Sequence, residues 1–295
     1  MTIREAQRIV DSLGAKNNLT EDEEFEYIEA LDYMIRTTSD PRYMMQLGGY
    51  YYGLRSFDLA LKYYDMAAEL GFEEANECLG YVWYYGRTGQ KDYEKAFKYF
   101  SAAADKGNIV ARYKIADMYK NGYYVDKDYG KYKEIIRELY PRILNARFLE
   151  EPLPEIFTRL AAIEAEEGNI DEAVDLYFRA KNFLAQRIMY NPFFGNLNIM
   201  KWLIEDLYKL IEPDPIEMDL FDLYYWLTKP CRISFRAEGV KHKVSCVEEN
   251  GENVIDFEGQ WYRNVDDFFK KATIDDRLIT DMLMDLDNFV LEEGG

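Results

Sequence analysis

The sequence predicts a mostly α-helical protein, in which stacked helix pairs are followed by a small α+β domain. Residues recur at a fixed spacing through the first two thirds of the chain, and apolar residues there lie three and four positions apart, as on one face of a helix. From Lys229 onward, apolar and polar residues alternate, as they do in strands. We therefore expect a helical repeat domain over residues 1–212 and a small α+β domain, with a linking helix, over residues 213–295.

The repeated residues are small or aromatic, and each matched pair lies 36 positions apart. Ala60, Tyr64, Ala67, Ala68, Gly71 and Ala75 in one copy correspond to Ala96, Phe100, Ala103, Ala104, Gly107 and Ala111 in the next. Small residues allow two helix axes to approach closely, and the aromatic rings fill the space between neighbouring pairs. A glycine after the second helix of each copy can adopt the left-handed conformation that ends it. Stacked repeats of this kind bury one continuous core.

One unit carries the most complete pattern. It has Leu79-Gly80, Trp83 and Gly86, followed by Asp92, Lys95-Ala96, Tyr99-Phe100, Ala103-Ala104, Gly107 and Ala111. This pattern resembles the Sel-one-like branch of the tetratricopeptide superfamily, and the resemblance covers about residues 41–181. The third unit departs from it at Tyr132, where a small alanine is expected, and the fourth looks like an ordinary tetratricopeptide unit. The resemblance implies a right-handed α-α solenoid and a role as a protein-binding adaptor, because such repeats are adaptors in many unrelated systems.

In tetratricopeptide pairs, the first helix of each unit lines the concave face. Aligning the units on Leu47, Leu79 and Ile115 puts ten residues there: Met45, Tyr52, Glu77, Tyr81, Tyr84, Tyr85, Tyr113, Asp117, Lys120 and Asn121. We expect these residues to bind a protein or peptide segment, with Tyr52, Tyr81, Tyr84 and Tyr113 partly exposed, because tyrosines on rigid helices offer contact area at low entropy cost. The alternative is that these tyrosines pack against neighbouring units or the C-terminal domain.

Three aromatic residues hold the repeat position that packs between helices, and they are predicted to be core. They are Tyr51, Trp83 and Tyr119. Outside the clear repeats, Thr20 and Glu23 form the pattern of a capping box, and Asp40-Pro41 is typical of a helix start. Further helices are expected near 197–211 and 216–228, with a break at residues 212–215.

The C-terminal domain is predicted to contain strands and two helices. Apolar and polar residues alternate around Ile233 and again around Val244, and Asn250-Gly251 is a hairpin signal. Residues 254–257 form the next expected strand. Asn264 is placed to cap a helix that runs to about residue 272, and a final helix is expected over about residues 279–291.

The net charge of −19 argues against nucleic acid and anionic membrane surfaces as partners, since both are negatively charged. More than half of this charge lies from residue 213 onward, where 9 Lys and Arg face 19 Asp and Glu. The start of the chain lacks the apolar stretch of a signal peptide, and the three cysteines do not suggest a disulfide framework. We therefore expect a cytoplasmic protein whose partner is another protein.

The sequence contains little that predicts catalysis, a cofactor or a metal. His242 is the only histidine, and it is interpreted as a partly exposed strand residue rather than as half of a dyad with Cys231 or Cys246. Residues 126–130 begin like a calcium loop, but Arg137 stands where a bidentate carboxylate belongs. A similar start at Asp285 fails because Val290 replaces the required glycine. We expect a protein that is not an enzyme and needs no cofactor.

Two other functions remain open at this point. The acidic C-terminal domain would suit an inhibitor or immunity-type protein that neutralises a basic partner. The many carboxylates would also allow an enzyme with a pair of carboxylates across a cleft, although sequence alone cannot pair them.

Overall fold

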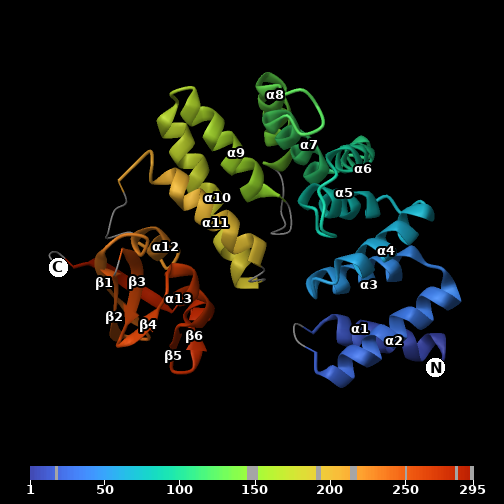
Figure 1. Cartoon of the computed structure of the whole chain (residues 1–295), viewed down its shortest axis with the longest axis horizontal. Coiled ribbons are helices and arrows are strands. Elements are labelled where there is room, and N and C mark those ends of the chain that lie inside the picture. Colours follow the sequence, from blue (N-terminus) through green and yellow to red (C-terminus); the bar gives the residue numbers. More distant parts are fainter. Residues whose placement is uncertain are drawn as a thin grey trace. The chain divides into compact units, whose positions relative to one another are not determined.

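The computed structural model describes residues 1–16, 19–144, 152–190, 194–212, 218–249, 251–282 and 285–292 (Figure 1). The chain divides into two compact units, Met1–Leu139 (unit 1) and Tyr140–Gly295 (unit 2). This division lies between Leu139 and Tyr140, whereas the sequence predicts a domain boundary between residues 212 and 213. The latter boundary stays a prediction. No helix in the described part of the chain is long and apolar enough to cross a membrane.

Unit 1 consists of helices that pack in consecutive pairs. They are α1 (Ile3–Gly14), α2 (Glu21–Thr38), α3 (Pro41–Gly53), α4 (Phe57–Glu69), α5 (Ala75–Tyr85), α6 (Tyr93–Asp105), α7 (Ile109–Asn121) and α8 (Tyr129–Ile143), which crosses the unit boundary. The second helix of each pair also packs on the first helix of the next, as α4 does on α5 and α6 on α7. This continuous packing confirms the predicted stack of helix pairs.

The local sequence explains where these helices begin and end. Thr20 and Glu23 form the predicted capping box, and Asp40 accepts a hydrogen bond from the Arg42 N–H at the start of α3. Gly71 (φ 80°) and Gly107 (φ 91°) are both in the left-handed region just after α4 and α6. Both glycines therefore end helices in the way that the repeat pattern predicts.

Each of two repeats brings a glycine against an aromatic ring. A Cβ atom on Gly80 would lie 2.5 Å from the ring of Phe100, and one on Gly48 would lie 2.6 Å from the ring of Tyr64. Phe100 and Tyr64 are both buried. The first helix of each pair can approach the second this closely only because no side chain stands at the glycine position.

Gly80→Val is expected to lower the free energy of unfolding by about 1–3 kcal/mol, because the added methyl groups overpack the contact with Phe100. Urea unfolding of the full chain measures this loss. Gly49→Val is the matched control, since it places the same side chain on a helix where the nearest atom would be 4.0 Å away. Equal stability of the two variants would show that the Gly80 contact is not tight.

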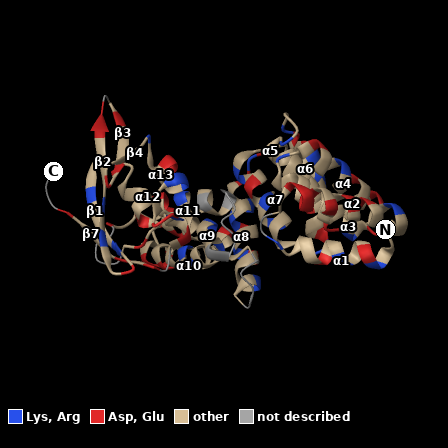
Figure 2. Ribbon diagram, turned by 90° about the horizontal axis from the view of Figure 1, so that it is seen from below, with Lys and Arg blue, Asp and Glu red and all other residues tan. Residues whose placement is uncertain are grey.

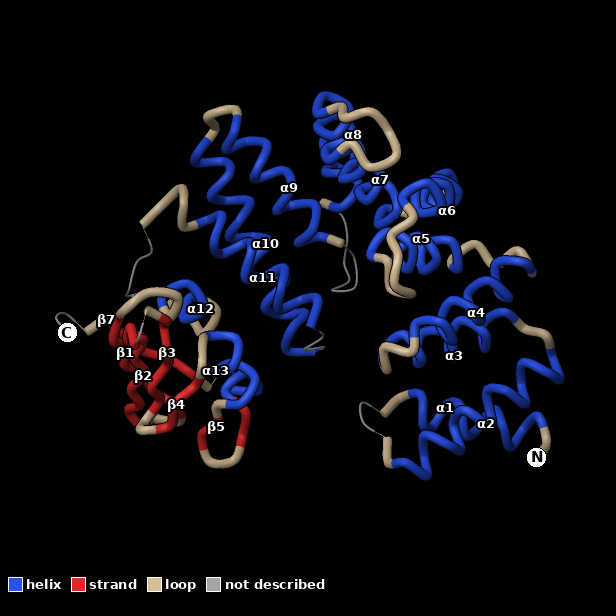
Figure 3. The backbone as a smooth tube through the Cα atoms, viewed as in Figure 1, coloured by secondary structure: helices blue, strands red, loops and turns tan. Residues whose placement is uncertain are grey.

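Unit 2 begins with long helices and ends in a sheet (Figure 3). The helices are α9 (Leu153–Glu166), α10 (Ile170–Tyr190) and α11 (Phe194–Leu207), followed by the short α12 (Asp222–Trp226). The five-stranded sheet has the order β4-β3-β2-β1-β7, and all its neighbouring strands are antiparallel. Its strands are β1 (Cys231–Ala237), β2 (Val240–Glu249), β3 (Glu252–Phe257), β4 (Gln260–Tyr262) and β7 (Leu286–Leu291).

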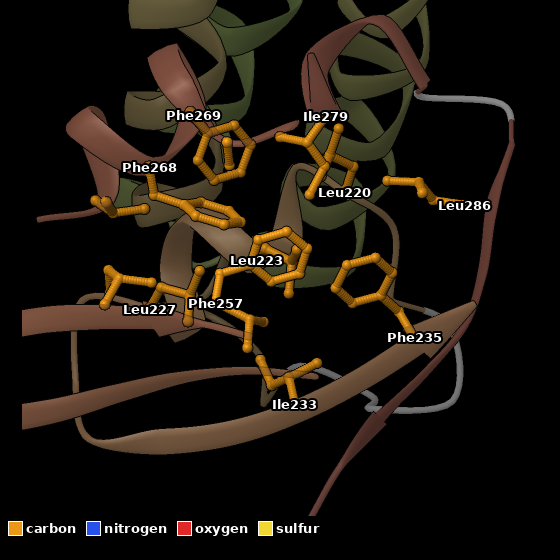
Figure 4. Close-up of a cluster of buried hydrophobic side chains, with 14 of the residues drawn as sticks. Leu220, Leu223, Leu227, Ile233, Phe235, Phe257, Phe268, Phe269, Ile279 and Leu286 are labelled. Atoms are coloured by element: carbon orange, nitrogen blue, oxygen red, sulfur yellow. The ribbon is translucent and has the colours of Figure 1, made fainter. Parts of the chain in front are cut away.

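One face of this sheet carries the core of the C-terminal part. Ile233, Phe235 and Phe257 project from the strands and pack with Leu223 of α12 and Phe268 of α13 (Val265–Lys271) (Figure 4). A two-stranded ribbon, β5 (Thr273–Ile274) and β6 (Arg277–Leu278), and the 3-10 helix η2 (Ile279–Met282) complete the fold. The alternation in β1 and β2 therefore corresponds to one face packed on the core and one outer face, on which Ser234 is also buried.

The structure confirms the hairpin between residues 249 and 252 and the helix capped by Asn264. Asn250 itself and residues 213–217, which include most of the expected break, lie outside the described residues. The helix expected near 216–228 is shorter than predicted, since only Asp222–Trp226 is helical among residues 218–228.

The prediction of a final helix over residues 279–291 is wrong. Residues Ile279–Met282 form η2, and Leu286–Leu291 form strand β7, which pairs with β1. The register shifts between Ser234 and Arg236 of β1, opposite Asn288, whose φ is 51°. This irregularity puts Leu286 and Phe289 on the same face although they are three residues apart. A spacing of three resembles helical periodicity, which explains the error.

Candidate protein-binding face

Five of the predicted tyrosines gather in unit 1 around two cations. This tyrosine cluster consists of Tyr52 of α3, Tyr81, Tyr84 and Tyr85 of α5, and Tyr113 of α7, together with Arg87 and Lys114. On α5, residues 81, 84 and 85 are three and four positions apart and share a face. The stacking of successive repeats then brings α3, α5 and α7 together.

Lys114 lies at the centre of four rings. Its side chain is almost fully buried, with the residue 6% exposed, and its Nζ is 5.2–5.4 Å from the ring centroids of Tyr81, Tyr84, Tyr85 and Tyr113. The ammonium also donates a hydrogen bond of 2.9 Å to the Tyr85 hydroxyl. The negative faces of the rings stabilise this cation electrostatically and replace much of its lost hydration.

Tyr81 and Tyr113 form the inner side of the cluster. Their hydroxyl oxygens are 3.1 Å apart, and burial raises the pKa of Tyr81 well above its usual range. Tyr113 is only 3% exposed, so the expectation that its ring is partly exposed is wrong. Its ring is covered because it packs inside the same group of side chains that surrounds Lys114. Tyr81 is partly exposed, as expected, whereas Tyr113 supports the cluster from inside.

Tyr85 and Arg87 form the accessible side. Tyr85 is 40% exposed, and its ring stacks on Tyr81 at a centroid distance of 5.9 Å. The Arg87 guanidinium lies 4.9 Å from the centroid of the Tyr85 ring, and its Nε donates a hydrogen bond of 3.0 Å to the Tyr52 hydroxyl. Arg87 takes this position because Gly86, at φ 63°, ends α5 and turns the chain back.

Glu77 lies close to the cluster and is partly buried. Its carboxylate accepts a hydrogen bond of 2.6 Å from Asn108, the N-cap residue of α7. Burial raises the pKa of Glu77, while this hydrogen bond and the charge of Lys114 oppose the rise. The carboxylate therefore offsets part of the positive charge of Lys114.

The other predicted site residues lie apart from these rings. Met45 packs against two hydrophobic clusters, one built mainly from α1, α2 and α3 and one shared by α4 and α5. Lys120 lies 5.0 Å from the ring centroid of Tyr132 of α8, and the Asn121 side chain donates to the Asp117 carbonyl. The structure thus brings six predicted residues together and leaves Met45, Asp117, Lys120 and Asn121 outside the cluster.

Sequence reasoning missed both cations of the cluster. Lys114 lies three residues before Asp117, so helical periodicity puts it on the same face as the predicted Asp117 and Asn121. This helical spacing was enough to identify Lys114 as a candidate site residue. Arg87 lies beyond the end of α5, and the sequence contains no comparable sign that the turn at Gly86 brings it over Tyr52 and Tyr85.

The aromatic residues predicted as core are only partly buried. The Lys95 ammonium lies over the Trp83 ring, 3.9 Å from its centroid, and the buried indole N–H has no hydrogen-bond partner among the described residues. Tyr51 stacks on Tyr63 at 5.8 Å, and Tyr119 lies edge-on to Phe97 at 6.3 Å. All three pack between helices, as the repeat position predicts, yet each keeps an exposed edge.

His242, Cys231 and Cys246, the residues considered for a dyad, are not arranged as a nucleophile and its base. His242 is buried between Phe235 and Phe257, so the interpretation of a partly exposed residue is wrong, and its Nδ1 is 2.9 Å from the Glu258 carboxylate. Cys246 lies four residues further along the same strand, about 13 Å away at the usual rise per residue. Burial raises the pKa of Cys231, the cross-strand neighbour of Cys246, to about 11, so its thiol is not activated.

The carboxylate of the calcium-like sequence that the structure describes here has a structural role. Asp128, in the sequence that begins like a calcium loop, accepts a hydrogen bond from the Lys131 N–H at the start of α8. Within the described ranges, no group of three or more His, Cys, Asp or Glu side chains is placed to hold a metal ion.

Comparisons with known proteins point to one repeat family. The Sel1 repeat family model matches residues 41–72, 78–108 and 109–131. No curated protein matches the sequence. A solved structure of a Sel1 repeat protein from Oxalobacter formigenes is 18% identical, with a TM-score of 0.50 over 76% of this chain and 82% of that one. The protective antigen c5321 of uropathogenic Escherichia coli, with an SLR fold, is 17% identical, with a TM-score of 0.38 over 65% of this chain and 46% of that one.

Proposed function

We propose that the protein is a non-enzymatic cytoplasmic adaptor that binds a segment of another protein at the tyrosine cluster, because Sel1 repeats lie at residues 41–72, 78–108 and 109–131 of this chain. Proteins with Sel1 repeats generally mediate protein–protein interactions. The partner and the binding face are specific to each protein. For this chain, the assignment of the face rests on the geometry of unit 1.

The observation that supports the proposal is the pairing of accessible aromatic rings with cations that hold them in place. Tyr85 is exposed, and Tyr52, Tyr84 and Arg87 are half-buried beside it. Stacking on Tyr81 and the hydrogen bond from Lys114 fix the Tyr85 ring before any partner arrives. A preorganised aromatic surface loses little side-chain entropy on binding. The adjacent Arg87 suits a segment that carries a carboxylate next to an apolar residue.

Tyr85→Ala is expected to weaken capture of the partner by about 2 kcal/mol, which is roughly 30-fold in affinity. The full chain is immobilised, and proteins retained from native cytosol are quantified by mass spectrometry against the Tyr85→Ala variant. The matched control is Phe25→Ala, because Phe25 of α2 is also an exposed aromatic residue and lies outside the cluster. Selective loss of the same proteins with Tyr85→Ala alone supports the proposal, and equal retention by both variants contradicts it.

A further inference from the structure

The open face of the five-stranded sheet is positively charged although unit 2 belongs to an acidic chain. In β1, Arg232 and Arg236 alternate with the buried Ile233 and Phe235, so both arginines point away from the core. Lys241 and Lys243 of β2 point to the same side, where they are 57% and 64% exposed. We call these four residues, Arg232, Arg236, Lys241 and Lys243, the basic sheet face.

The helices of unit 2 leave this face uncovered. α12 and α13 lie on the other side of the sheet, where they contribute to the core (Figure 2). No described element of unit 2 lies over the basic sheet face in this view. Lys and Arg colour β1, whereas Asp and Glu colour the tip formed by β2 and β3. The positive region is therefore confined to one part of the sheet.

The register of the strands places like charges directly opposite each other. Arg236 of β1 is the cross-strand partner of Lys241, and Ser234 is the partner of Lys243. Like charges at directly opposed positions destabilise a sheet. On the other side, β7 contributes Asp287 opposite Arg236. The four cations thus exceed the acidic groups that the fold supplies beside them.

A carboxylate of the chain itself already occupies part of this surface. Glu292, just after β7, lies 2.9 Å from the Lys243 ammonium and 3.7 Å from that of Lys241. The lysines hold the pKa of Glu292 below its usual range. This contact shows which chemical group the lysines can take, namely a carboxylate presented by extended backbone.

Next to Glu292 lies a cleft with an apolar side. Its volume is about 380 Å³, and it is lined by Ser234, Phe235, Arg236, Lys241, Asn288 and Val290. Val290 is exposed, so the cleft offers an apolar contact between charged side chains. A volume of this size suits one or two side chains of a peptide. A long polyanion fits less well, because Glu249 and Glu252 at the tip of the hairpin would repel it.

We propose that the basic sheet face binds a short acidic segment of another protein, in extended conformation, and that Glu292 occupies part of the site in the absence of that segment. This site is separate from the tyrosine cluster. From the sequence, we considered a basic partner for the acidic C-terminal domain. The basic sheet face instead suits an acidic partner.

A fluorescein-labelled hexaglutamate peptide tests the proposal by fluorescence anisotropy with the full chain. The double variant Lys241→Ala/Lys243→Ala is expected to weaken binding about tenfold or more, and Glu292→Gln to strengthen it severalfold. The control double variant Lys209→Ala/Lys270→Ala removes the same charge from two exposed positions, one in the turn just after α11 and one on α13. It should bind like the parent.

Several outcomes would overturn the proposal. Equal loss in both double variants would mean that only the net charge matters, and unchanged or weaker binding by Glu292→Gln would mean that Glu292 does not compete. Tighter binding of phosphatidylserine vesicles or an RNA oligonucleotide than of the peptide, with the same dependence on Lys241 and Lys243, would assign the face to a different class of partner. Concentration-dependent dimerisation lost in the Lys241→Ala/Lys243→Ala variant would assign it to a second copy of this chain.

Discussion

Lys181→Met is expected to destabilise unit 2 by about 3–5 kcal/mol at pH 7, because it leaves a buried carboxylate without its counter-ion. The Lys181 ammonium lies 2.7 and 2.8 Å from the two carboxylate oxygens of Asp222, and both residues are buried. It also contacts Asp219 at 3.0 Å, and the Tyr208 hydroxyl donates to Asp222. Hydrogen exchange of peptides from α10 and β1 measures the loss within this unit.

The matched control is Lys209→Met, since Lys209, in the turn just after α11, forms an exposed ion pair with Asp206 of that helix. Exposed pairs contribute between 0 and about 1 kcal/mol, so exchange should change little. The pH dependence provides a second check. Burial and the neighbouring Asp222 carboxylate raise the pKa of Asp219 to about 6 even with Lys181 present. Without the ammonium this pKa rises further, so the variant should regain stability as the pH falls from 7 towards 4. A deficit independent of pH would contradict this account.

Phe100→Ala is expected to lower the free energy of unfolding of unit 1 by about 3–5 kcal/mol, the usual loss for a fully buried aromatic residue. Phe100 fills the space in front of Gly80, and its ring lies 5.7 Å from Tyr81 and 6.1 Å from Tyr84. Urea unfolding monitored by far-UV circular dichroism measures the loss. Removing the ring also takes away the support behind two members of the tyrosine cluster, so partner capture should fall with it.

Phe25→Ala serves as the control for this prediction as well. Phe25 is 71% exposed, so its removal should change stability by less than about 0.5 kcal/mol. If Phe100→Ala were no more destabilising than Phe25→Ala, the stability of the repeat core would not depend on the large ring at the repeat position of Phe100. If stability fell while partner capture stayed intact, Phe100 would not support the binding face.

The repeat architecture could be predicted because its determinants are local and periodic. Small residues such as Gly80 and Ala96, paired with a large ring at Phe100, specify a close helix contact in any sequence context. The helix caps at Thr20 and Asp40 were predictable for the same reason. The tyrosines of α5 followed from one helical face. These features depend on spacing along the chain, which sequence displays directly.

What could not be predicted depends on contacts across elements. Whether Tyr113 is exposed depends on how completely Lys114 and the rings of α5 fill the space around it. The position of Arg87 depends on the turn that Gly86 makes after α5. In β7, a local irregularity at Asn288 gives a strand the spacing of a helix, and only its pairing with β1 distinguishes the two.

The contact of Gly80 with Phe100, and that of Gly48 with Tyr64, link the volumes of two distant positions in the sequence. Neither position can change size alone, since enlarging the glycine overfills the contact and shrinking the ring leaves a cavity. Substitutions that survive during divergence should therefore arrive in compensating pairs, with a larger residue in the first helix accompanied by a smaller one in the second. The summed volume of the two positions would then stay nearly constant within each helix pair, even where the individual residues differ.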